Sequence, residues 1–233
     1  MTTALQVQCF PGSTELTAAL AARLESALSP GAGGAPALML SGGNTPLPAY
    51  RAVAARAARA PAGTQLLYSD DRYVPSSSEA SNYFQTRGLI EALALPEEQI
   101  LRVRTELPLE EAAADYDRRL AALFAKRPSI ALGLLGLGAD GHTASLFRAA
   151  DLERARGRLA LAVHRPDGRD AVTVTPAVLE RVSEIVFVVA GADKRPALEA
   201  LLAGRETSVA WQAVCRCGHV EVWTEPAAYG RDL

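Results

Sequence analysis

The feature that most constrains this chain is the regular alternation of short apolar runs with longer segments of helical periodicity. Apolar runs at residues 37–40, 66–68, 130–135 and 185–190 predict buried strands. Between the strands, segments such as 16–28 carry leucine at every fourth position, which is typical of a helix with one buried face. Strands that alternate with helices favour a mostly parallel sheet with helices on both faces. We therefore expect a doubly wound α/β fold.

Weaker patterns extend this arrangement toward both ends of the chain. Residues 6–10, 159–163 and 171–175 predict further strands, and residues 220–223 predict a late strand that we place at an edge of the sheet. No linker rich in proline, glycine or serine is long enough to require a domain boundary. A chain of 233 residues can bury a sizeable core, so we treat residues 1–233 as a single α/β domain.

The charge and cysteine content exclude several classes of partner and location. The 24 basic and 26 acidic residues give a formal net charge of −2, which does not indicate nucleic acid or a membrane surface as a partner. Three cysteines are too few and too unevenly placed for a disulfide framework. Neither a signal peptide nor an apolar run long enough to span a bilayer is apparent. We expect a cytoplasmic protein with no membrane partner.

A glycine-rich loop after the strand at 130–135 is the first candidate for chemistry. The three glycines of residues 136–141 permit a tight turn and a close backbone approach to a ligand. Asp140 and His142 lie two residues apart in this turn, where Asp140 would orient the imidazole ring and stabilise an imidazolium. The alternative is a surface or satisfied core histidine. Residues 143–147 then predict the start of a helix.

The glycine spacing of this loop also matches the G-x-G-x-x-G fingerprint of dinucleotide-binding proteins. Two observations argue against a dinucleotide. Asp140 lies where the pyrophosphate would have to approach, and the next predicted strand ends in His164 and Arg165 instead of the acid that would hold a ribose. The fingerprint is therefore weak evidence here.

A second glycine-rich turn joins the strand at 37–40 to the following helix. Gly42 and Gly43 lie in the turn, with Thr45 at the expected N-cap and Pro46 at the expected first helical position. Free backbone N–H groups and the helix dipole at such a junction favour an anion, typically a phosphate. The alternative is a tight turn that needs glycine only for its backbone angles.

Two more strand ends carry charged side chains. Asp70, Asp71 and Arg72 follow one strand, and because adjacent acids point in different directions, at most one of them faces a site. Arg72 can offer a fixed charge to a phosphate or an oxyanion, and Lys194 can bind phosphate as a point charge. The alternatives are a solvated polar loop for the first segment and a charged helix start for Asp193 and Lys194.

The segment that contains Cys215, Cys217 and His219 superficially suggests a metal site. Three close ligands without a fourth nearby make a poor zinc site, so we interpret the segment as a strand and a turn. The role of these three side chains stays open.

Four of these segments follow predicted strands, namely residues 41–45, 70–72, 136–142 and 193–194. In a parallel sheet the carboxyl ends of the strands meet at one edge, so the four segments are expected to lie together. That edge would hold a phosphate cradle, two cations and an acid–histidine pair. The residues alone thus predict an enzyme that acts on a small phosphorylated substrate by acid–base chemistry.

Several motifs resemble a known family over nearly the whole chain, from about residue 5 to 224. They are L-S-G-G-N-T-P at 40–46, D-D-R-Y-V-P at 70–75 with S-N-Y at 81–83, G-L-G-A-D-G-H-T-A-S-L-F at 136–147, and V-A-G-A-D-K at 189–194. They are similar to the lactonases of the glucosamine-6-phosphate isomerase/6-phosphogluconolactonase family. The deaminases of that family have an acid a few residues past the histidine, whereas residues 143–148 contain none. The departures are Asp71 where glutamate is usual, Arg148 where proline is usual, and a less typical segment at 205–219.

The resemblance implies a Rossmann-like fold and hydrolysis of 6-phospho-D-glucono-1,5-lactone to 6-phosphogluconate in the oxidative pentose phosphate pathway. It implies His142 as the general base that activates water, with Asp140 holding the ring and Arg72 or loop N–H groups as oxyanion donors. The implied substrate-binding residues are Ser41, Gly42, Gly43, Thr45, Asp70, Arg72, Gly138 and Lys194. We expect no metal or organic cofactor, because a lactone is an activated ester, and either a monomer or a homodimer.

Two other functions stay open at this point. One is an aldose–ketose isomerase or deaminase, in which an acid such as Asp70 would abstract a proton. The other is a non-catalytic sensor of sugar phosphates on the same fold.

Overall fold

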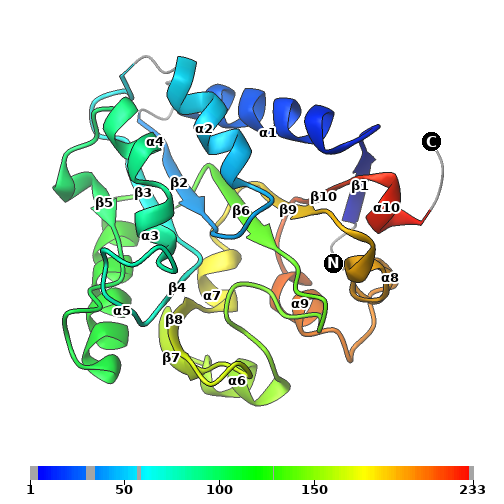
Figure 1. The fold of residues 1–233 in the computed structure, drawn as a ribbon. Coiled ribbons are helices and arrows are strands. Elements are labelled where there is room, and N and C mark those ends of the chain that lie inside the picture. Colours follow the sequence, from blue (N-terminus) through cyan, green and yellow to red (C-terminus); the bar gives the residue numbers. More distant parts are fainter. Residues whose placement is uncertain (1–4, 30–34, 57–58, 128, 231–233) are drawn as a thin grey trace.

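The computed structural model describes residues 5–29, 35–56, 59–127 and 129–230. Strands form two sheets, and helices surround the larger sheet (Figure 1). The strands are β1 (Leu5–Cys9), β2 (Ala37–Leu40), β3 (Gln65–Tyr68), β4 (Asp70–Arg72), β5 (Ile100–Leu101), β6 (Leu132–Gly136), β7 (Ala160–His164), β8 (Asp170–Val174), β9 (Ile185–Val189) and β10 (Val220–Thr224). The α-helices are α1 (Ser13–Leu28), α2 (Leu47–Arg56), α3 (Asn82–Gln85), α4 (Arg87–Ala92), α5 (Leu109–Lys126), α6 (Ala149–Arg154), α7 (Pro176–Leu179), α8 (Arg195–Leu202), α9 (Val209–Val214) and α10 (Pro226–Tyr229). Short 3₁₀ turns are η1 (Glu97–Gln99) and η2 (Ala192–Lys194).

The larger sheet has seven strands in the order β1-β10-β9-β6-β2-β3-β5, and every recorded pair in it is parallel. This confirms the doubly wound, mostly parallel sheet. The late strand β10 lies between β1 and β9, so its expected place at an edge was wrong. The edge belongs instead to β1, whose side chains alternate between half-buried and exposed, as an edge strand can tolerate.

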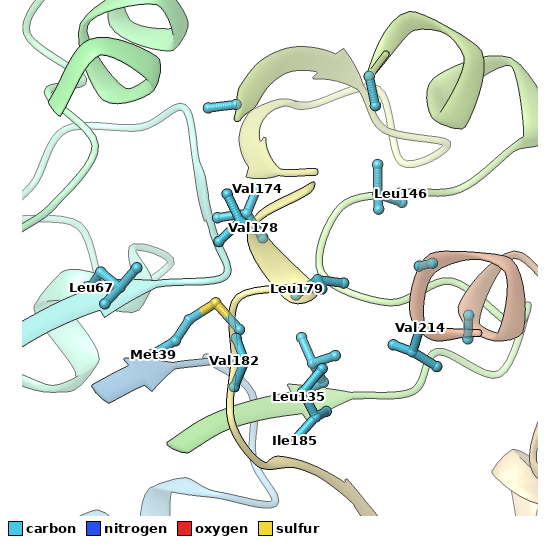
Figure 2. Close-up of a cluster of buried hydrophobic side chains, with 14 of the residues drawn as sticks. Met39, Leu67, Leu135, Leu146, Val174, Val178, Leu179, Val182, Ile185 and Val214 are labelled. Carbon is cyan, nitrogen blue, oxygen red and sulfur yellow. The ribbon is translucent and has the colours of Figure 1, made fainter. Parts of the chain in front are cut away.

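Both faces of the large sheet are covered because successive side chains of a strand point to opposite faces. Leu38 and Leu40 of β2 pack in one core with α1, α2 and α4, whereas Met39 packs in the other core. Figure 2 shows Met39 and Leu135 from the sheet gathered around Leu179 and Val182 in this second core. Continuous apolar strands are therefore what this two-sided burial requires.

A second sheet of three antiparallel strands, in the order β4-β8-β7, lies beside the carboxyl ends of the large sheet (Figure 1). Where β4 forms, the sequence predicts no strand, and the strands that it predicts at 159–163 and 171–175 are not distinguished from the parallel ones. The small sheet brings the segment Ala160–Val174 next to Asp70–Arg72, since Asp70 pairs with Thr173 and Arg72 with Ala171. It therefore adds a wall that the apolar runs of the sequence do not predict.

Several expected boundaries shift in the structure. Helix α2 begins at Leu47, so Thr45 is not its N-cap, and Pro46 supplies the carbonyl that accepts from Ala49 and Tyr50. Near the end of the described chain, Pro226–Tyr229 form the short helix α10. Within the described ranges, no helix combines the length and the apolar character that crossing a membrane requires.

Candidate active site at the carboxyl ends of the strands

A cleft of about 450 Å³ opens at the carboxyl ends of β2, β3, β6 and β9. Here the order of the strands reverses, because β3 lies on one side of β2 while β6 and β9 lie on the other. Crevices at such switch points are where open α/β sheets bind ligands. The predicted residues that line the cleft are Ser41, Gly42, Gly43, Thr45, Asp70, Arg72, Gly138, His142 and Lys194.

A larger hollow of about 1150 Å³ lies at the opposite ends of the strands, around Ala37, Gln65 and Ala131. Its lining contains neither a histidine nor a carboxylate–histidine pair, so size alone does not identify the site. We place the chemistry in the smaller cleft, where the acid–base group and the glycine turns converge.

The loop after β6 presents His142 to the cleft together with its acid. His142 Nδ1 lies 2.5 Å from Asp140 Oδ1, and the same oxygen accepts from the backbone N–H of His142 at 3.3 Å. Desolvation raises the pKa of Asp140, but the hydrogen bond and charge of His142 lower it more, so this pKa lies below its ordinary value. A carboxylate on Nδ1 holds the proton there and leaves Nε2 to accept a proton from water.

The glycines of this loop are needed for close contact as well as for turning. A Cβ at Gly138 would lie 2.1 Å from His142 Nδ1 and 2.4 Å from Asp140 Oδ1. Gly141 has φ +84°, a left-handed conformation that side chains rarely adopt. The loop closes on itself, because Gly138 N–H donates to His142 O at 2.8 Å. Asp140 itself lies outside the lining of the cleft, behind the histidine ring.

The predicted helix at 143–147 does not form, and α6 begins only at Ala149. The side chains of this segment bond to distant parts of the chain instead. Thr143 Oγ1 donates to Gly136 O at 3.0 Å, and Ser145 Oγ donates to Asp70 Oδ2 at 2.6 Å. The first bond closes the histidine loop onto the end of β6, and the second ties it to Asp70 at the start of β4.

Asp70 and Asp71 point in different directions, as expected for neighbours in a strand. Asp70 faces the cleft, whereas Asp71 is buried and accepts from the backbone N–H groups of Asn82 and Tyr83. Burial raises the pKa of Asp71 to about 6, against the lowering effect of these hydrogen bonds. Asp71 therefore anchors the loop that follows β4 and makes no contact with the cleft.

Arg72 reaches the cleft and is held by that same loop. Its Nη1 donates to Asn82 Oδ1 at 2.6 Å and to Ala80 O at 3.1 Å. Asn82 also packs so closely on Gly42 that a Cβ there would lie 1.8 Å from Asn82 Oδ1. The glycine of the second turn is thus required by the side chain that positions Arg72.

The turn after β2 presents polar atoms that have no hydrogen-bond partner in the described part of the chain. Among the described residues, Ser41 Oγ is buried without a hydrogen bond, and the N–H groups of Asn44 and Thr45 donate to no protein atom. Lys194 lies across the cleft at the end of η2, and its Nζ is 3.3 Å from Asp193 Oδ2. Open donors facing a lysine are suited to bind a phosphate.

Two residues that line the cleft, Asn82 and Arg165, were not predicted as site residues, nor was Phe147, which packs against His142 and Arg165. Asn82 had appeared only within a family motif, and Phe147 as part of an expected helix. Arg165 follows β7 and enters the cleft from the small sheet. The turn sequence Pro-Asp-Gly directly after Arg165 was the available signal, because it predicts a hairpin and hence an antiparallel pair.

The cysteine segment does not form a metal site in the part of the chain that the structure describes. No group of three or more histidine, cysteine, aspartate or glutamate side chains there could hold an ion. His219 Nε2 lies 2.9 Å from Glu221 Oε1, and Cys217 is buried. None of these residues lines the cleft.

Comparison with known proteins gives a consistent result. The model of the family described as glucosamine-6-phosphate isomerases/6-phosphogluconolactonase matches residues 11–223. The chain is 35% identical to human 6-phosphogluconolactonase over 216 residues, covering 86% of this chain and 82% of the human protein. It is 34% identical to the 6-phosphogluconolactonase of Nostoc sp. over 204 residues, covering 84% of each.

The fold agrees with a solved structure of the same kind. The crystal structure of 6-phosphogluconolactonase from Thermotoga maritima superimposes with a TM-score of 0.78 at 25% identity, covering 96% of this chain and 99% of that chain. The family model covers nearly the whole chain, including the four segments that form the cleft. This chain therefore belongs to the family of glucosamine-6-phosphate isomerases and 6-phosphogluconolactonases.

Proposed function

We propose that this chain hydrolyses 6-phospho-D-glucono-1,5-lactone to 6-phosphogluconate in the oxidative pentose phosphate pathway, without a metal. The observation that carries the proposal is His142, which is paired with Asp140 and lines the same cleft as the open turn after β2. The family and the names of its curated members support a lactone as the substrate. The scarcity of cysteine supports a cytoplasmic location.

The mechanism begins with a water molecule on the cleft side of His142. Nε2 takes a proton from this water as its oxygen attacks C1 of the lactone, and the carbonyl electrons move to an oxyanion. Loop N–H groups and Arg72 are candidate donors to this oxyanion. The C1–O5 bond then breaks, and the imidazolium returns its proton to O5 as the tetrahedral intermediate collapses to the free acid, which ionises to the carboxylate. Asp140 stabilises the imidazolium throughout, because its carboxylate bonds Nδ1.

The phosphate of the substrate would bind at the other group of donors. The N–H groups of the turn after β2 and the ammonium of Lys194 supply hydrogen bonds and positive charge to it. Binding at this remote group holds the lactone carbonyl near His142 and so contributes to the rate.

The alternative activity is that of a deaminase or isomerase, in which Asp70 would abstract a proton. Asp70 Oδ2 accepts from Ser145 Oγ at 2.6 Å and Oδ1 accepts from Ser69 Oγ at 2.9 Å, so both oxygens are already held by hydroxyl groups of the chain. The test is to assay the purified protein with both substrates. We expect lactone loss well above the spontaneous rate and no ammonia from glucosamine 6-phosphate. Ammonia release would favour the deaminase, and binding of 6-phosphogluconate without faster lactone loss would favour a sensor.

Replacing Lys194 with alanine should weaken binding of the phosphate group far more than it slows hydrolysis of the bound substrate. A charge-assisted hydrogen bond of this kind corresponds to roughly a tenfold to hundredfold increase in Kd for 6-phosphogluconate. Isothermal titration measures this directly, and Lys126→Ala, on the far helix α5, is the control with the same change. Unchanged affinity in Lys194→Ala would place the phosphate elsewhere.

Replacing Asp140 with asparagine should reduce kcat about tenfold. This is the lower end of the loss expected when a hydrogen bond to a charged group is removed, because the Asp140 carboxylate is half exposed. An amide stabilises the imidazolium less and can donate to Nδ1, which favours the wrong tautomer. Steady-state kinetics should show the loss in kcat with little change in KM. A change confined to KM would contradict this role of Asp140.

A further inference from the structure

Arg165 enters the cleft from the small antiparallel sheet. It follows β7 directly, and its backbone N–H donates to Arg169 O at 2.8 Å across the hairpin. Its side chain is only 12% exposed, although it sits beside a hairpin tip at the surface, and it lines the same cleft as His142. Burying a guanidinium is costly unless its charge and its N–H groups are used.

The contacts of Arg165 orient its side chain but leave some of its N–H donors without a partner among the described residues. Nη1 donates to Ser145 Oγ at 3.1 Å, and Nε lies 3.3 Å from each carboxylate oxygen of Asp167, which is largely exposed. The guanidinium lies over Phe147, 5.1 Å from the ring centroid. Nη2 makes no hydrogen bond within the ranges that the structure describes. A mostly buried cation thus keeps donors available for a ligand in the cleft.

The position of Arg165 associates it with the reacting end of the substrate. Both residues that hold it in the cleft, Ser145 and Phe147, belong to the loop that carries His142. The Phe147 ring contacts the side chains of both Arg165 and His142, and its centroid is 4.3 Å from that of the imidazole. The phosphate donors, by contrast, come from the turn after β2 and from Lys194.

We propose that Arg165 binds the C1 end of the substrate: it donates to the lactone carbonyl oxygen as this becomes an oxyanion, and to the carboxylate of the product. This inference rests on the proposed function. An arginine donor whose position is fixed by packing is suited to this task, because it carries a full charge into a site partly shielded from water and needs little reorganisation. Arg165 would then determine specificity for a substrate with an oxygen acceptor at C1.

The test compares two ligands that share the phosphate and differ at C1. 6-Phosphogluconate carries a carboxylate there, and glucitol 6-phosphate carries a hydroxymethyl group. In Arg165→Ala we expect the Kd of 6-phosphogluconate to rise roughly tenfold to hundredfold, as for the loss of one charged hydrogen bond, while the Kd of glucitol 6-phosphate changes less than about twofold. The matched control is Arg169→Ala, on the exposed side of the same hairpin.

Arg165→Lys separates charge from packing, because it keeps the cation and loses the planar donors. We expect it to recover part of the selectivity for the carboxylate ligand. Equal weakening of both ligands in Arg165→Ala would indicate a structural or phosphate-binding role and overturn the proposal, as would no weakening of either. These measurements need no turnover. A native protein that binds 6-phosphogluconate but fails to hydrolyse the lactone would overturn the proposed function, and with it the oxyanion role of Arg165, but not its binding of the C1 carboxylate.

Discussion

Replacing His142 with alanine is expected to slow enzymatic lactone hydrolysis by about 10²- to 10⁴-fold, the usual contribution of a positioned general base. The substitution removes the group that takes the proton from water, but it leaves the turn after β2 and Lys194 in place. Binding of 6-phosphogluconate should therefore change little while kcat falls. Because the lactone also opens spontaneously, the measurement is its rate of loss at several protein concentrations, with the slope taken as the enzymatic rate.

His164 provides a matched control for this experiment. It also pairs with an aspartate through Nδ1, since Asp170 Oδ1 contacts it, but its side chain is 85% exposed and lies outside the cleft lining. His164→Ala should retain the native rate. If His142→Ala hydrolyses the lactone as fast as the native protein, the imidazole is not the base, and the acid–histidine pair does not carry the reaction.

The sequence was sufficient to predict which segments form the cleft. Buried strands are recognisable as apolar runs, and a parallel sheet places all their carboxyl ends at one edge whatever the strand order. The segments at 41–45, 136–142 and 193–194 could therefore be brought together with no knowledge of distances. Strand geometry also predicted that at most one of Asp70 and Asp71 faces the site, but it left open which of the two does.

The wall built by the small sheet could not be predicted in the same way. The strands β7 and β8 are as apolar as the parallel strands, so periodicity does not reveal that they pair antiparallel with each other. Likewise, residues 143–147 were predicted to begin a helix, but their side chains form long-range bonds instead, such as that from Ser145 to Asp70. Arg165 was missed because both errors concern the elements that hold it.

The other large effect is expected at Gly138, where alanine should lower kcat by about 10²-fold, since a displacement of about 1 Å at reacting groups costs this much. The Cβ of alanine would lie 2.1 Å from His142 Nδ1, so the imidazole and Asp140 must move apart. The backbone of Gly138 does not have a positive φ, so the strain arises from this contact and not from the turn itself. Kinetics should show lower kcat, and 6-phosphogluconate should still bind.

The control for the loss of a glycine is Gly88→Ala in α4, where a Cβ would meet nothing within 4 Å. That variant should keep full activity and gain roughly 0.5–1 kcal/mol of stability, as alanine does over glycine inside a helix.

A double variant then tests how Gly138 acts. If alanine at Gly138 acts by displacing His142, adding it to His142→Ala should cost almost nothing further, because the group that it displaces is already absent. Two independent, multiplicative losses would mean that Gly138 serves the reaction through another part of the loop, such as an N–H group that donates to the oxyanion.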